Sequence, residues 1–176
     1  MTDADIKPAA QGSPFWRFSL KFYRAPGVAD ACIALQEGAG VDVNLLLFLL
    51  WQATQRRAFT AADVVALEDR VGPWRDAAVI PLRNVRRALK SPPALVAAGT
   101  AEAFRTRIKA VELEAERLQQ EAMYELAATS PLGRDVTSPV EAARLNVAAY
   151  ATMRAVAFPS AAVDTVLTAF ANLKGE

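Results

Sequence analysis

The sequence predicts an all-α protein: a single-domain helical bundle of about seven or eight helices around a buried central helix at about residues 42–57. Residues 45–51 are seven consecutive large apolar residues, so a helix there must be covered on all sides. Elsewhere apolar residues recur at spacings of three and four. β-branched residues never alternate over a useful length, so the sequence gives no sign of a strand.

Length and composition indicate one folded domain. The chain has 176 residues, of which 53% are hydrophobic and 22% are charged, a globular composition. We expect residues 1–13 to be a flexible tail and residues 14–176 to be a single helical domain. A subdomain boundary near residues 91–100 is the alternative, because an aromatic-rich half gives way there to an alanine- and glutamate-rich half.

Local signals mark where the helices start and stop. Ser13-Pro14 and the capping box from Ser138 to Glu141 each combine an N-cap serine with proline at the first helical position. Thr60 and Asp63 form a weaker box, and Asp42 is placed to cap the central helix. Pro81 should kink its segment or divide it in two. The expected helices cover residues 14–24, 28–37, 42–57, 60–71, 74–90, 100–128, 139–157 and 160–173.

The helix at 100–128 should be the longest, about 40 Å, and it should run past the globule or form a helical hairpin. Its apolar residues alternate spacings of four and three, which predicts a narrow seam like that of a coiled coil. A structural helical oligomer, with the chain as a homo-oligomer, is therefore one hypothesis. The seam consists of Phe104, Ile108, Val111, Ala115, Leu118 and Ala122.

Several function classes are disfavoured by composition. The net charge is +1, which argues against a general nucleic-acid binder. The chain has no histidine, so it cannot form a Ser-His-Asp or Cys-His centre, and we expect no metal site and no cofactor. The single cysteine, Cys32, is expected to be a buried thiol in a reducing cytoplasm. We expect no membrane association, because no secretory signal and no run of roughly 20 apolar residues is present.

Three stretches of the first half carry a resemblance: FWRFSLKFYRAPGV, CIALQEGAGVDVNLLLFLLW and WRDAAVIPLRNVRRALK. Together they resemble a family of small bacterial conserved hypothetical proteins with a domain of unknown function. The resemblance covers about residues 15–90, and DVNLLLFLLW at residues 42–51 is its most specific part. It implies a bacterial, soluble, mostly helical protein, and it supplies no catalytic residues.

Basic residues cluster in one segment of this nearly neutral chain: Arg75, Arg83, Arg86, Arg87 and Lys90. The segment is interpreted either as a solvated basic face or as a site for phosphate, carboxylate or an acidic partner, groups that guanidinium forks bind well. A second basic stripe would add to it if the two helices were neighbours. That stripe consists of Arg17, Lys21 and Arg24.

The first turn of the central helix is the second candidate site. Asp42 and Asn44 place polar chemistry, and the free N–H groups of a helix start, beside the core. Trp74 and Arg75 could complete a pocket there. The alternative is structural, with Asn44 bonding nearby backbone and the tryptophan packing in the core.

The leading functional hypothesis is a non-enzymatic cytoplasmic binding or adaptor protein whose basic face receives an acidic protein. The alternative is a small-molecule binder, or an enzyme acting on an anionic phosphate or carboxylate substrate. The two readings differ in where the arginines of residues 83–90 lie. A flat, solvent-facing array favours the first, and a concavity favours the second.

Overall fold

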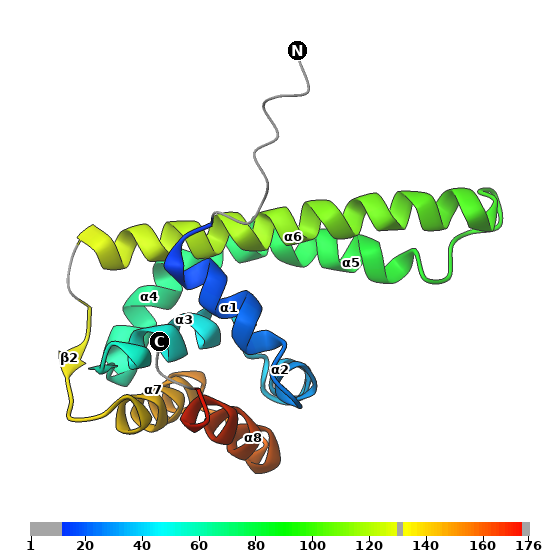
Figure 1. The fold of residues 1–176 in the computed structure, drawn as a ribbon. Helices are drawn as coiled ribbons and strands as arrows, with labels where there is room; N and C mark the ends of the chain where they lie inside the picture. Colours follow the sequence, from blue (N-terminus) through cyan, green and yellow to red (C-terminus); the bar gives the residue numbers. More distant parts are fainter. Residues whose placement is uncertain (1–11, 130–131, 174–176) are drawn as a thin grey trace.

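The computed structural model describes residues 12–129 and 132–173 and confirms the all-α class. Figure 1 shows the arrangement of its elements. The expected tail lies outside the described residues, except for Gly12 and Ser13. The helices are α1 Pro14–Tyr23, α2 Val28–Ala39, α3 Val43–Thr54, α4 Ala61–Trp74, α5 Ile80–Ala88, α6 Ala98–Thr129, α7 Pro139–Arg154 and α8 Ser160–Ala171.

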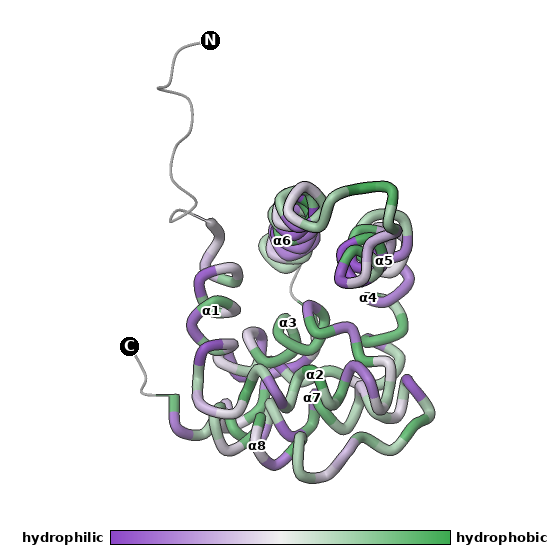
Figure 2. The backbone as a smooth tube through the Cα atoms, turned by 90° about the vertical axis from the view of Figure 1, so that its right-hand side faces the viewer, coloured by the Kyte–Doolittle hydropathy of each residue, from purple (hydrophilic) through white to green (hydrophobic). Residues whose placement is uncertain are grey.

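The central helix is α3, which lies between the other helices in Figure 2. Its residues 44–50 are all buried, as the unbroken apolar run predicts. Asp42 caps it: its Oδ1 accepts from the backbone N–H of Asn44 at 2.9 Å and of Leu45 at 3.4 Å. The helix ends at Thr54, three residues earlier than expected. None of the helices in the described part of the chain is long and apolar enough to cross a bilayer.

The helices α2, α7 and α8 pack on one side of α3 (Figure 1). Cys32 of α2 is fully buried there, and burial raises the pKa of its thiol to about 12. The raised pKa favours the protonated thiol at neutral pH, which is the less nucleophilic form.

The break expected at Gly72-Pro73 is absent: α4 runs through both residues to Trp74 and continues as a π-helical turn, Arg75–Val79, directly into α5. In that turn the N–H of Ile80 donates to the carbonyl of Arg75, five residues earlier. The wider turn accommodates the ring of Pro81, which would clash with a carbonyl in an ideal α-helix. The segment therefore bends without stopping.

The helices α5 and α6 form an antiparallel hairpin that extends beyond the rest of the fold at its loop end (Figure 1). The helix α6 has 32 residues, about 48 Å. Residues 91–100, where the sequence offered a subdomain boundary, form the turn of the hairpin and the first residues of α6.

The seam predicted along α6 does not face the core. Phe104, Val111 and Leu118 are 47%, 52% and 44% exposed. Of the seam, Ala115 is buried, but half of the six buried residues of α6 are polar. The six are Ala101, Glu112, Ala115, Gln119, Gln120 and Met123. Polar residues can occupy the buried face because hydrogen-bond partners from α3 and α5 meet them there.

One short sheet was not expected from the sequence. Strand β1, Arg57–Ala58, pairs antiparallel with β2, Arg134–Asp135. Beside it, Asn146 of α7 is fully buried and joins three segments. Its Oδ1 accepts from Phe59 N at 2.7 Å, and its Nδ2 donates to Leu49 O at 2.8 Å and to Arg57 O at 3.0 Å. This side chain closes the turn that follows α3.

Candidate functional site

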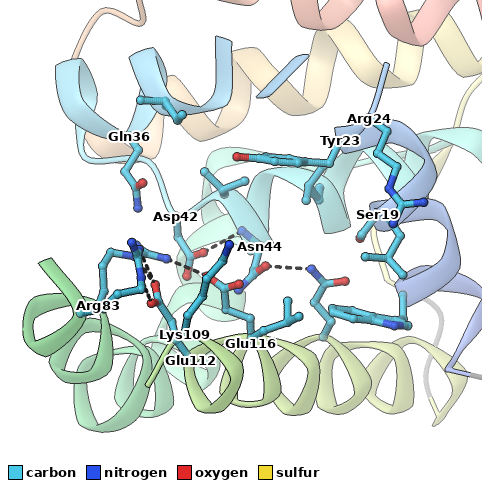
Figure 3. Close-up of a pocket in the computed structure, with 18 of the residues that line it drawn as sticks. Ser19, Tyr23, Arg24, Gln36, Asp42, Asn44, Arg83, Lys109, Glu112 and Glu116 are labelled. Carbon is cyan, nitrogen blue, oxygen red and sulfur yellow. Dashed lines mark hydrogen bonds and ion pairs between the residues drawn. The ribbon is translucent and has the colours of Figure 1, made fainter. Parts of the chain in front are cut away.

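A cleft of about 580 Å³ lies between α1, α2, the start of α3, α5 and α6 (Figure 3). This volume is in the range typical of sites for small molecules. Apolar side chains from four helices line part of it: Leu20 and Tyr23 of α1, Ile33 of α2, Leu47 of α3 and Leu113 of α6. The cleft therefore combines an apolar lining with charged groups.

Six basic and four acidic side chains line the cleft. Four of the basic ones have no acidic partner among residues 12–129 and 132–173: Arg24 of α1, Arg87 of α5, Lys90 just after α5, and Lys109 of α6. Arg24 and Lys109 reach the cleft from different walls in Figure 3. Cations from three elements thus converge on one space, where each can still take an anionic partner.

The other two basic residues, Arg83 and Arg86, are bound to acids of α6. Arg83 Nε donates to Glu112 Oε1 at 3.1 Å and Arg83 Nη2 to Glu116 Oε1 at 2.8 Å. Arg86 donates to both oxygens of Glu112, with Nη2 at 3.1 Å from Oε1. These bonds join α5 to α6 and make a fixed wall of the cleft.

The two glutamates of this wall have opposite pKa shifts. Burial raises the pKa of Glu112, but hydrogen bonds from Arg86 and Arg83 outweigh burial and hold it below its usual value. Glu116 has fewer such bonds, and burial keeps its pKa above the usual value despite Arg83. Protonation of Glu116 in mild acid would leave the cleft more positive.

The floor at the start of α3 is a chain of amides. Gln120 Nε2 donates to Asn44 Oδ1 at 2.8 Å, and Asn44 Nδ2 donates to Gln119 Oε1 at 2.9 Å. Gln119 Nε2 then donates to Asp42 Oδ2 at 3.0 Å. The Asn44 side chain thus bonds two buried glutamine side chains instead of the nearby backbone that the structural alternative predicted, and the residue also lines the cleft.

Three residues that line the cleft carry a buried polar atom with no hydrogen-bond partner among the described residues. They are Trp16 Nε1, Ser19 Oγ and Gln120 Oε1. Each such atom costs about 1–3 kcal/mol of desolvation free energy unless it finds a partner. A bound molecule that supplied those partners would recover that free energy.

Six of the eight residues proposed from the sequence line this cleft, and two do not. Those that do are Asp42, Asn44, Arg83, Arg86, Arg87 and Lys90. Trp74 and Arg75 lie outside its lining. The indole Nε1 of Trp74 donates to Ala115 O at 2.9 Å, while Arg75 binds Glu68 at 2.7 Å and Asp42 at 3.4 Å. Both residues hold α4 and its π turn in place.

Sequence reasoning missed Ser19, Tyr23 and Lys109 as members of the site, whereas Trp16, which precedes Arg17, was a candidate for the rim of a pocket and lines the cleft. Glu112 and Glu116 are four residues apart and share one face of α6, but only the hairpin brings that face against α5. Of the basic stripe on α1, Arg24 joins the cleft.

A second hollow of about 580 Å³ adjoins the end of α3 and is lined by Trp51 and Tyr124. Its charged group is Arg57, whose guanidinium already donates to Leu132 O and Gly133 O and pairs with Asp135. The charged group of this hollow is therefore already paired, whereas four cations of the cleft have no acidic partner among the described residues. No three His, Cys, Asp or Glu side chains gather as metal ligands in the described ranges.

Comparison with known proteins identifies the family of this chain. A search of curated proteins and a search of solved structures each returned no match. A family model described as a protein of unknown function, DUF2390, matches residues 14–123. The match extends beyond the resemblance noted at residues 15–90 and includes most of α6 and every helix that lines the cleft. Since it covers more than half of the chain, the protein belongs to the DUF2390 family of proteins of unknown function.

Proposed function

We propose that this protein binds a small anionic molecule in the cleft between α1, α2, α5 and α6. One observation carries the proposal: Arg24, Arg87, Lys90 and Lys109 converge on one concave space without acidic partners among the described residues. A phosphate or carboxylate is the group that such guanidinium and ammonium donors bind best.

The position of the α5 arginines favours a small molecule over a flat protein partner. Arg83 and Arg86 are each only about one-fifth exposed, because Glu112 and Glu116 hold them against α6. Arg87 and Lys90 line the same concavity. A concave site with apolar and cationic walls is the usual form of a small-molecule site, whereas a broad acidic partner needs exposed cations.

The test is a titration of inorganic phosphate, citrate and uridine 5′-monophosphate, followed by calorimetry and thermal shift. Arg87→Gln combined with Lys90→Gln should weaken binding of a phosphate ligand about 10-fold or more, through loss of two charge-assisted contacts. Arg70→Gln combined with Arg107→Gln is the matched control, since both of these exposed cations lie outside the cleft. Equal binding by the two double variants, or no binding of any anion to the unaltered protein, contradicts the proposal.

An adaptor for an acidic protein is the second candidate, supported by the charge of the hairpin. Residues 83–109 contain seven basic residues and one acidic residue, Glu102, in a chain of net charge +1. Leu95 in the turn is 95% exposed. Arg107→Glu with Leu95→Asp changes the hairpin but not the cleft lining, so loss of a partner in pull-down by this variant alone would favour the adaptor.

We also propose a cellular location and self-association for this protein. A bacterial origin is supported by the family resemblance, and a cytoplasmic location by the single cysteine, which is buried and free. Self-association is supported by the exposed row of Phe104, Val111 and Leu118, which repeats every seven residues along α6. Sedimentation velocity over a range of concentrations, with Val111→Lys as the disrupting variant, tests it.

A further inference from the structure

The amide chain at the cleft floor has a fixed direction. A carboxylate only accepts hydrogen bonds, so Asp42 requires the NH₂ group of Gln119. The oxygen of Gln119 then faces Asn44, which must present its NH₂ group and turn its own oxygen toward Gln120. Asp42 therefore sets the orientation of three amides.

The chain ends in an unsatisfied acceptor. Gln120 donates its NH₂ group to Asn44, which leaves Gln120 Oε1 buried without a donor among the described residues. Because Asp42 fixes the direction of the chain, Gln120 cannot flip to present a donor without breaking the hydrogen bond to Asn44. A molecule bound at this end of the cleft is therefore selected for an N–H or O–H group.

A second residue of the cleft lining has an unsatisfied donor. Trp16 Nε1 is buried and can only donate, and it has no acceptor among the described residues. Ser13, one turn before it, donates its backbone N–H to Glu121 Oε1 at 2.9 Å, so the start of α1 packs against α6 next to Gln120. Ser19, one turn after Trp16, adds a hydroxyl that can donate or accept.

We infer that the ligand is an anion whose neutral part carries an amide or lactam edge, with an N–H beside a C=O. The N–H donates to Gln120 Oε1 and the C=O accepts from Trp16 Nε1, while the phosphate or carboxylate lies among Arg24, Arg87, Lys90 and Lys109. The apolar lining, including Leu20 and Leu47, packs against the body between the two ends. This inference rests on the proposed anion site and names the class of molecule that fits it.

Matched ligand pairs test the inference in the unaltered protein. Uridine 5′-monophosphate has a lactam N–H, and its N3-methylated form does not. N-acetylglutamate has an amide N–H, and its N-methylated form keeps the C=O and both carboxylates but lacks the N–H, so the two pairs also separate a phosphate source from a carboxylate source. In at least one pair the N–H form should bind about 10-fold more tightly by calorimetry, the effect of one buried hydrogen bond left unmade.

A protein variant tests the second inferred contact, in which Trp16 Nε1 donates to the C=O group of the ligand. Trp16→Phe removes the indole N–H and keeps an aromatic ring, so it should weaken the N–H ligand of that pair about 5- to 10-fold and leave inorganic phosphate unaffected. Trp74→Phe is the control, because that indole donates to Ala115 O outside the cleft. Thermal unfolding of both variants verifies that they fold.

The outcomes separate the two proposals. If inorganic phosphate binds in the cleft but neither ligand pair shows a preference, the amide inference is overturned and the anion site stands. An unchanged affinity in Trp16→Phe also overturns it. If no anion binds the unaltered protein, both proposals fall.

Discussion

Arg83 and Glu112 join the two arms of the helical hairpin, with Arg83 Nε donating to Glu112 Oε1 at 3.1 Å. Glu112 also binds Arg86, so one buried carboxylate pairs with two guanidinium groups. Two cations of the predicted basic face, Arg83 and Arg86, therefore stabilise the hairpin. In the proposed anion site, the cations beside them are the ones without acidic partners among the described residues.

Glu112→Gln should therefore destabilise the protein by about 2 kcal/mol, because Arg86 loses its counter-ion and Arg83 keeps only its bond to Glu116. The cost is below that of a fully buried pair, since both arginine side chains keep some solvent contact. Urea denaturation measures it. Glu114→Gln is the control: its carboxylate pairs with Arg117 on the surface of the same helix, and its loss should cost less than about 0.5 kcal/mol.

Asp42→Asn should abolish the preference for ligands that carry an N–H group, and the variant should still fold. An amide at this position can still cap α3 through its oxygen, but its NH₂ group would face the NH₂ group of Gln119. The chain then reverses, and Gln120 presents a donor. The ratio of affinities for uridine 5′-monophosphate and its N3-methylated form should fall toward unity. A ratio that matches the unaltered protein would contradict the fixed direction of the chain.

Asn146→Leu should cost about 3 kcal/mol. It leaves Phe59 N, Leu49 O and Arg57 O without their partner in a buried turn. Asn84→Leu on the exposed face of α5 should change the free energy of unfolding by less than about 0.5 kcal/mol. Equal losses in the two variants would show that the network adds nothing.

Anion affinity should rise as the pH falls from neutral toward 4.5. Burial raises the pKa of Glu116 above 4.5, the ordinary value of a glutamate. As the pH falls, this carboxylate therefore takes up a proton before an ordinary glutamate does, and the cleft becomes more positive. Sulfate keeps its charge over this range and is the suitable probe. Glu116→Gln should bind sulfate more tightly at neutral pH and lose most of the pH dependence. A steeper dependence in the variant would rule out Glu116 as the titrating group.

The central helix and its cap could be predicted because the signals are local. The run at residues 45–51 requires burial on every side, and Asp42 is an N-cap type directly before it. The family resemblance rested on the same residues and is confirmed by the match at residues 14–123.

The inner face of α6 could not be predicted, because periodicity counts apolar residues and half of the buried residues on this face are polar. Glu112 and Gln119 are buried there only because Arg83 and Asn44, far away in the sequence, supply partners. Likewise, Trp74 was placed near a pocket from its neighbour Arg75, whereas the helix that continues past Pro73 turns both toward structural contacts.

The most direct test of an anion site in the cleft is the indole N–H region of a ¹⁵N–¹H NMR spectrum. The three tryptophans give three signals, and only Trp16 lines the cleft; Trp51 lines the other hollow and Trp74 neither. Trp16→Phe and Trp74→Phe assign the signals. Titration with inorganic phosphate and uridine 5′-monophosphate should shift the Trp16 signal saturably and leave the other two in place. A stationary Trp16 signal, or a larger shift at Trp51, would contradict the account.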